Sequence, residues 1–234
     1  MGWVSVAGAV AAGGGLGFVL RRWAACYAGR LDQGAAVTAR TLWAAAVEAG
    51  SGLLRRGQDG LAAMLLGGLA GWLAWAQGPA LLPLALGLAA LAWLDARTGL
   101  LPDALTIPLM VVGWVLGAQG AAAAAGASAL VWAVLSGMAW LYRCLRGRDG
   151  FGGGDVKCLA ALAGWLGADA AAGILWLACV LGVCLSLGRR GGWRRPYPFG
   201  PCIALAAWVW MLAPRSFCAA CELFRGILAV QSGF

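Results

Sequence analysis

Two aspartates are the residues of this sequence whose type and position suggest chemistry. Asp95 ends one apolar run, and Asp155 begins another directly after three glycines. Only nine of the 234 residues are Asp or Glu, and an ionisable side chain beside apolar membrane helices costs roughly a few kcal/mol or more, so a carboxylate there indicates function. If the two carboxylates meet, one keeps a proton, and the pair can polarise a peptide carbonyl and deprotonate a water. The two aspartates therefore predict peptide hydrolysis without a covalent intermediate.

Each aspartate also has a structural interpretation. Asp155 could cap the helix that follows it, and Asp95 could be a solvated residue at a helix end. Their positions further suggest an asymmetry, because the helix dipole favours a carboxylate at an N-terminus and disfavours one at a C-terminus. On this argument Asp155 is the ionised partner and Asp95 carries the shared proton.

The sequence lacks the parts that competing mechanisms need. It contains no His, which excludes a Ser-His-Asp or Cys-His site and disfavours a catalytic zinc. The glycine run does not contain the GxxxxGK[ST] pattern of a nucleotide-binding loop. Glycines do allow close backbone approach, so an extended substrate segment could lie beside Asp155.

The elements that must position these aspartates are apolar helices. Hydrophobic residues make up 62% of the chain and charged residues 11%, with a mean hydropathy of +0.83, far from the composition of soluble domains. A polytopic, all-α transmembrane bundle of about eight spans is predicted, since the apolar runs do not alternate as barrel strands would. The runs are Trp3–Leu20, Leu61–Ala76, Ala80–Leu94, Leu105–Gly117, Ser128–Tyr142, Val156–Leu166, Ala170–Leu187 and Phe199–Leu212.

The positive charges predict the orientation of these spans. The net charge is +8, and cytoplasmic loops collect Lys and Arg, so this excess needs no nucleic-acid partner. The assigned cytoplasmic residues are Arg21, Arg22, Arg30, Arg40, Arg55, Arg56, Arg97, Arg143, Arg146, Arg148, Lys157, Arg189, Arg190, Arg194 and Arg195. Both termini are then outside, and Asp95 and Asp155 lie near the cytoplasmic face. The first run has no positive region before it, so it is expected to remain as a span.

The polar segments and the cysteines are less informative. Residues 35–54 form either a helix on the membrane surface or a plain connecting loop. Cys218 and Cys221 make a single CxxC pair in the predicted outside tail. A disulfide between them is an open alternative, whereas structural zinc takes four ligands, so no metal site is expected.

Glycines recur at a spacing of four residues, which lets membrane helices approach closely. The pairs are Gly13 with Gly17, Gly67 with Gly71, and Gly113 with Gly117. In a chain with 38 glycines, this spacing does not by itself identify a helix crossing.

Three segments together resemble the type IV prepilin peptidases, bacterial GxGD aspartyl proteases of the inner membrane. Residues 95–109 (DARTGLLPDALTIPL) resemble the first-aspartate segment of that family. Residues 147–157 (GRDGFGGGDVK) and 160–167 (AALAGWLG) resemble its second-aspartate segment, and residues 198–201 (PFGP) its late proline motif. The three motifs occur in the order that the family has.

The resemblance implies an enzyme that removes a short basic leader from type IV pilin-like or pseudopilin precursors, for pilus or type II secretion machinery. It implies catalytic roles for Asp95 and Asp155 at the cytoplasmic border of the bacterial inner membrane. It also implies that five motif residues bind substrate or support the site: Gly152, Gly154, Lys157, Pro198 and Gly200. Lys157 could support the site by tuning Asp155 electrostatically. The simpler interpretations are that Asp103 starts a helix as its N-cap, that Lys157 snorkels to the interface, and that Pro198 breaks a helix.

The first loop departs from the family. Many members carry two zinc-binding CxxC pairs there and also methylate the new N-terminus from S-adenosylmethionine. This loop has only Cys26, so no metal is expected, and S-adenosylmethionine is a cofactor only if methyltransferase activity is retained. We therefore divide the chain into residues 1–60, a first transmembrane helix with a loop lacking those pairs, and residues 61–234, the peptidase domain. The alternative is a non-catalytic membrane assembly or transport protein that uses the aspartates for packing or ion passage.

Overall fold

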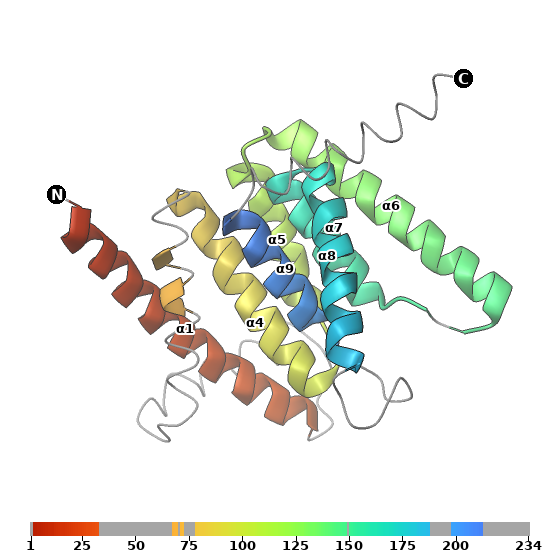
Figure 1. Ribbon diagram of the computed structural model, residues 1–234, viewed down its shortest axis with the longest axis horizontal. Coiled ribbons are helices and arrows are strands. Elements are labelled where there is room, and N and C mark those ends of the chain that lie inside the picture. The colour runs from red at the N-terminus through yellow and green to blue at the C-terminus, as the bar shows by residue number, and fades with distance from the viewer. Residues whose placement is uncertain are drawn as a thin grey trace.

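The computed structural model describes residues 2–32, 67–69, 71–72, 78–148, 150–187 and 198–212. Over these ranges the chain forms helices and short connections, with no β-strand, so the all-α prediction is confirmed (Figure 1). The helices are α1 (Gly2–Asp32), α4 (Leu82–Thr98), α5 (Asp103–Leu116), α6 (Ala121–Arg146), α7 (Gly153–Leu166), α8 (Ala168–Leu187) and α9 (Gly200–Leu212). A 3-10 turn, η1 (Pro79–Leu81), leads into α4.

Seven of the eight predicted apolar runs coincide with these helices. The run Leu61–Ala76 lies largely outside the described residues, although 67–69 and 71–72 are helical. The end of the first run was wrong, because α1 continues through Arg21, Arg22 and Arg30 to Asp32. Hydropathy falls where these arginines begin, but they do not break a helix. Residues 35–54, Cys218 and Cys221 lie outside the described residues.

Within the described residues, three helical segments are long and apolar enough to cross a membrane: Pro79–Thr98, Ala121–Arg146 and Ala168–Leu187. The helices α5 and α9 are apolar but shorter. The protein is therefore a helical membrane protein, and the count of about eight spans remains a prediction.

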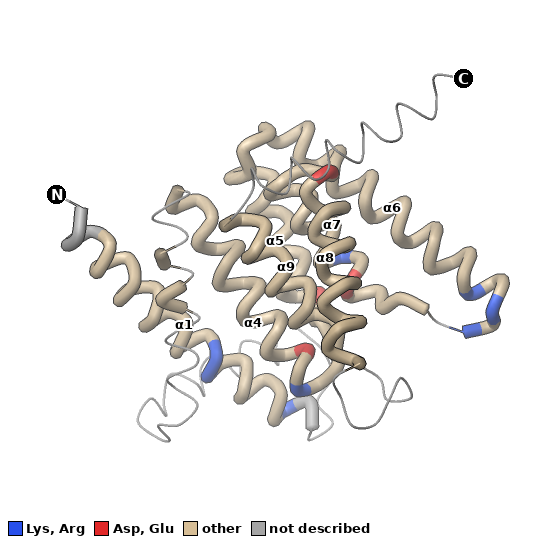
Figure 2. The backbone as a smooth tube through the Cα atoms, viewed as in Figure 1, with Lys and Arg blue, Asp and Glu red and all other residues tan. Residues whose placement is uncertain are grey.

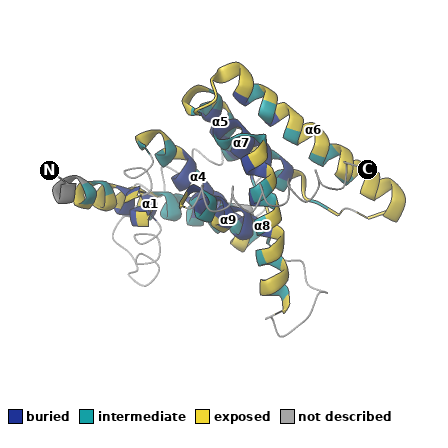
Figure 3. Cartoon of the chain, turned by 45° about the horizontal axis from the view of Figure 1, so that its top comes forward, coloured by how far each residue is buried: buried dark blue, intermediate teal, exposed yellow. Residues whose placement is uncertain are grey.

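Successive helices from α4 to α8 reverse direction through short connections, so neighbours pack side by side, and α9 packs against α4 and α8 (Figure 1). The helix α7 lies in the interior of this arrangement, where it packs against α5, α6 and α8. From Cys158 to Trp165 every residue of α7 is buried. The helix α6 lies on the outside, and most of its length is coloured as exposed in Figure 3. Its exposed residues include large apolar ones such as Trp140 and Met138. A lipid environment explains such an exposed apolar face.

Two of the glycine pairs noted in the sequence face each other. A Cβ on Gly67 would collide with the carbonyl oxygen of Gly13 and lie 2.8 Å from Gly17 Cα. A Cβ on Gly71 would lie 3.2 Å from Gly13 Cα. The helix α1 therefore crosses residues 67–69 and 71–72 at close range, because only glycine leaves room for the two backbones.

The third glycine pair brings α5 against α7. A Cβ on Gly113 would lie 2.7 Å from Trp165 Nε1, and a Cβ on Gly117 would lie 2.6 Å from the carbonyl oxygen of Gly164. Trp165 also donates a hydrogen bond of 2.8 Å to the carbonyl oxygen of Leu109. The two glycines thus allow α5 and α7 to pack at close range, and the carbonyl oxygen of Leu109 satisfies the buried indole N–H of Trp165.

Candidate active site

Asp95 lies in the last turn of α4, where the chain is about to leave the helix. Gly99 ends the helix in the left-handed conformation, with φ of 65°, and its N–H donates to the carbonyl oxygen of Asp95. The hydroxyl of Thr98 donates to the carbonyl oxygen of Leu94 at 2.8 Å. A glycine is suited to this cap because it carries no Cβ to oppose a positive φ. The cap fixes the helix end, and the side chain of Asp95 is only 4% exposed.

Asp155 lies in the first turn of α7, which begins at Gly153 after the N-cap residue Gly152. A Cβ on Gly152 would lie 2.9 Å from Asp155 Oδ2, and a Cβ on Gly154 would lie 2.9 Å from Leu101 Cβ. The two glycines therefore make room for the carboxylate and for the loop that follows Asp95. The half-buried side chain of Asp155 does not make the N-cap bond that sequence alone suggested, because Gly152 occupies the cap position.

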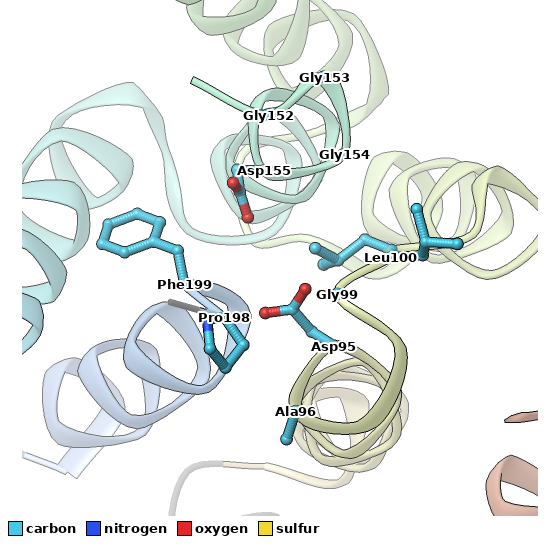
Figure 4. Close-up of a pocket in the computed structure, with 11 residues that line it drawn as sticks. Asp95, Ala96, Gly99, Leu100, Gly152, Gly153, Gly154, Asp155, Pro198 and Phe199 are labelled. Carbon is cyan, nitrogen blue, oxygen red and sulfur yellow. The ribbon is translucent and has the colours of Figure 1, made fainter. Parts of the chain in front are cut away.

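Asp95 and Asp155 line the same pocket, which has a volume of about 440 Å³. Figure 4 shows both carboxylates directed into the same space, from the end of α4 and the start of α7. The lining residues are Asp95, Ala96, Gly99, Leu100, Leu101, Gly152, Gly153, Gly154, Asp155, Pro198 and Phe199. The predicted meeting of the two carboxylates in one site is thus seen, and each comes from a different motif.

Three large apolar lining residues, Leu100, Leu101 and Phe199, were not singled out from the sequence, although each lies in a quoted motif. Leu100 and Leu101 follow the helix-ending Gly99, and Phe199 stands between Pro198 and a glycine. Apolar residues at a predicted helix end, next to a turn signal, are the pattern that could have identified them. They give the pocket an apolar wall beside the carboxylates.

The proline motif supplies the third side of the pocket. Pro198 and Phe199 line it directly, and the ring of Phe199 meets that of Phe151 edge to face, with centroids 5.9 Å apart. Gly200 is buried and does not line the pocket, but its backbone N–H donates a hydrogen bond of 2.7 Å to Asp95 Oδ2. Of the five predicted supporting residues, Gly152, Gly154 and Pro198 line the pocket, whereas Gly200 lies behind it.

The fifth predicted supporting residue, Lys157, pairs with Asp103 and not with Asp155. Its Nζ lies 2.6 Å from Oδ2 of Asp103, which is the first residue of α5. Pro102, not Asp103, is the N-cap residue of that helix. Lys157 therefore neither tunes Asp155 by direct contact nor simply extends to the interface, and Asp103 is not a cap.

Asp155 directly precedes the apolar part of α7, and its carboxyl group lies in an unusually buried environment. Burial, and to a smaller extent the negative charge of Asp95, raise the pKa of Asp155 to about 7. Its Oδ1 is buried without a hydrogen-bond partner among the described residues. A carboxyl group in such surroundings holds a proton near neutral pH and can act as an acid.

The fold and the pocket define a helical membrane protein in which two carboxylates from separate helices face one cavity. Residues 81–187 match the family model described as the type IV leader peptidase family. The matched part of the chain includes both aspartates, so the resemblance found in the motifs is confirmed. No solved structure matches the chain.

Several curated proteins are similar to the chain over about half of its length. A prepilin leader peptidase/N-methyltransferase of Burkholderia pseudomallei is 41% identical over 129 residues, which cover 50% of this chain and 40% of that protein. A protein of the same description from Dichelobacter nodosus is 37% identical over 143 residues, 56% of this chain and 50% of that protein. A third, from Aeromonas hydrophila, is 36% identical over 133 residues, which cover 53% of this chain and 46% of that protein. The chain thus spans about half the length of the curated relatives it matches.

Proposed function

We propose that the protein is a membrane aspartyl endopeptidase that removes the basic leader from type IV prepilin-like precursors. The observation that carries this proposal is the shared pocket, into which Asp95 and Asp155 both project from the ends of different helices. The family of residues 81–187 and the names of the relatives support the substrate class. Asp95 and Asp155 are the catalytic pair in this proposal.

The reaction uses one carboxylate, one carboxyl group and one water. The carboxylate takes a proton from the water while the water oxygen bonds to the scissile carbonyl carbon, and the carboxyl group gives its proton to the carbonyl oxygen. In the second step the first aspartate returns its proton to the peptide nitrogen as the C–N bond breaks. As this bond breaks, a hydroxyl group of the tetrahedral intermediate gives its proton to the second aspartate, which becomes a carboxyl group again. The pair ends in its starting state, and no covalent enzyme intermediate forms.

The position of the site in the molecule supports cleavage at the cytoplasmic border. Asp95 lies in the last turn of the span Pro79–Thr98, beside Arg97. The basic residues of α4 and α6 also lie at the C-terminal ends of those helices, in the lower part of Figure 2. Short loops rich in Arg and Lys are cytoplasmic in bacterial membranes. We therefore propose about eight spans in the inner membrane, with the precursor's apolar helix in the bilayer and its leader in the cytoplasm.

The proposal covers the peptidase step. The relatives are named as N-methyltransferases too, but the CxxC pairs of the family's first loop are absent from this sequence. S-adenosylmethionine enters the proposal only if the new N-terminus carries a methyl group. The mass of the mature product, measured after cleavage, decides this point.

The test is co-expression of the full chain with candidate pilin-like precursors, with leader loss scored on gels and by mass. Wild type should convert a precursor to the shorter form, and Asp95→Asn and Asp155→Asn should abolish conversion while still inserting into the membrane. An assembly or transport protein would cut no precursor and would tolerate Asp→Glu at both positions. Retained cleavage by purified Asp155→Asn would overturn the proposal.

A further inference from the structure

Gly200 contacts the carboxylate of Asp95 but does not line the pocket. It is buried at the start of α9, and its N–H donates to Asp95 Oδ2 at 2.7 Å. A Cβ on this residue would lie 2.8 Å from Asp95 Oδ2, 2.9 Å from Asp95 Cβ and 3.0 Å from Asp95 Cγ. Real Cβ contacts are not this short, so any side chain here displaces the carboxylate from the amide that binds it.

No charged side chain provides this stabilisation among the described residues that pack around Asp95. The helix α9 contains none. On α1 and α4, Arg21 and Arg97 lie over the Trp93 ring, 4.7 and 4.9 Å from its centroid. On α7 and α5, Lys157 pairs with Asp103. The backbone amide at the positive end of the α9 dipole is therefore the donor that faces Asp95.

Among the described residues, Asp155 has no donor that matches the Gly200 amide at Asp95. Oδ1 of Asp155 is buried with no hydrogen-bond partner in the part of the chain that the structure describes. A carboxylate that accepts a backbone N–H is stabilised in its charged form, whereas an unsatisfied buried carboxyl oxygen favours the neutral form. The two aspartates thus occupy different electrostatic environments inside one pocket.

From this geometry, and resting on the proposed peptidase function, we propose that Gly200 is a positioning residue that holds Asp95 as the ionised base, leaving Asp155 to donate the first proton. This is the reverse of the assignment that helix polarity alone suggested for the pair. The reason is that a third helix, α9, begins against Asp95 and offers its amide there. The proposal also explains why the residue between Phe199 and Pro201 is a glycine.

The first experiment compares Gly200→Ala with Gly137→Ala in the purified full chain, using a precursor that the wild type cleaves. Gly137 lies on the exposed side of α6, and a Cβ there meets nothing within 4 Å. We expect Gly200→Ala to lower kcat about 100-fold, because a misplaced reacting group costs on this order, with KM changed less than about twofold. The acid limb of its pH profile should move to higher pH, since Asp95 loses its donor. Gly137→Ala should match wild type in all three measurements.

A second measurement does not depend on substitution at position 200. Infrared titration of isotope-labelled aspartate carboxyls is compared in Asp155→Asn, which retains Asp95, and in Asp95→Asn, which retains Asp155. We expect the carboxyl that remains in Asp155→Asn to ionise at the lower pH. Single variants are used because a coupled pair titrates as a unit. The opposite order would overturn the proposal even if Gly200→Ala failed to fold.

The outcomes separate this inference from the function on which it rests. If wild type cuts no precursor, the peptidase proposal itself is wrong. If wild type cuts, both Asn variants are inactive, and Gly200→Ala cleaves at the wild-type rate with an unmoved acid limb, then the peptidase proposal stands and the role of Gly200 is wrong.

Discussion

Lys157 Nζ lies 2.6 Å from Asp103 Oδ2, and this ion pair joins the start of α7 to the start of α5. Asp103 follows the first aspartate by eight positions in the sequence, and Lys157 follows the second by two. The pair therefore connects the two segments that carry the pocket carboxylates. Both side chains are well exposed, at 37% and 53%. Exposed ion pairs add little to stability, typically 0–1 kcal/mol, so its contribution is to the relative placement of the two segments.

The first prediction concerns this ion pair. Lys157→Met should lower cleavage several-fold while reducing the free energy of unfolding by less than about 1 kcal/mol. Asp103→Asn should have a similar effect, and the double variant should be no worse than either single one, because the two residues act through one contact. Initial cleavage rates and thermal unfolding in detergent check this. Arg146→Met at the end of α6 is the control, and additive losses in the double variant would contradict the prediction.

The second prediction compares two adjacent glycines before Asp155. A Cβ on Gly154 would lie 2.9 Å from Leu101 Cβ and 3.3 Å from its carbonyl oxygen, whereas a Cβ on Gly153 meets nothing within 4 Å. Gly154→Ala should therefore destabilise the protein by about 1–3 kcal/mol, the usual cost of overpacking, and should reduce cleavage. Gly153→Ala should unfold at or above the wild-type temperature. Thermal unfolding of both variants in the same detergent measures the difference, and equal midpoints would argue against this packing.

The helices and the two catalytic candidates were accessible from the sequence because each depends on local pattern. Apolar runs with polar or glycine boundaries gave the existence of α4 to α9, and their ends agree within a few residues for α7 and α9. Asp95 and Asp155 stood out because acids are scarce among apolar helices. Hydropathy failed for α1, whose second half packs Ala24 and Tyr27 against Leu94 despite the nearby arginines.

The partners of the site residues were not accessible, because they depend on contacts between distant segments. Gly200 and Asp95 are 105 positions apart, and Lys157 and Asp103 are 54 apart. The dipoles of α4 and α7 act on the aspartates that these helices carry, but a third helix also contributes. The N-terminus of α9 supplies a hydrogen bond to Asp95, and its position cannot be read from the polarity of α4 and α7. Long-range packing decides such partners, whereas the sequence shows only which residues are available.

The third prediction tests the close crossing of α1 with residues 67–72. A Cβ on Gly13 would collide with the carbonyl oxygen of Gly67 and lie 2.8 Å from Gly71 Cα, whereas a Cβ on Gly15 meets nothing within 4 Å. Gly13→Ala should thus lower the unfolding temperature, at a cost of about 1–3 kcal/mol. Gly15→Ala should be neutral or slightly stabilising, since alanine favours a helix interior by about 0.5–1 kcal/mol. A Gly13→Ala protein as stable as Gly15→Ala would mean that the two backbones do not meet here.

The fourth prediction concerns the alkaline side of the activity profile. The pKa of Asp155 is raised to about 7 by burial and by the charge of Asp95. If Asp155 donates the first proton, then kcat/KM should fall as pH rises through about 7, because the deprotonated group cannot act as an acid. Rates with one precursor at a series of pH values between about 5 and 9 would show the limb. Activity that stays level across this range would contradict the acid role of Asp155.

The last prediction follows from the same group but needs no substrate. The pKa of Asp155 is about 7 in the folded protein against an ordinary value of 3.8, so the folded state binds the proton more tightly than the unfolded state does. Between these two values the folded state therefore holds more protons, and stability falls as pH rises from about 4 to about 7, then levels off. Below both values the contribution is fully present. In Asp155→Asn this part of the slope should disappear, whereas Asp169→Asn, at the start of α8, should keep it. Unfolding temperatures of the three proteins across this pH range make the comparison, and a wild-type slope that survives in Asp155→Asn would assign the titration to another group.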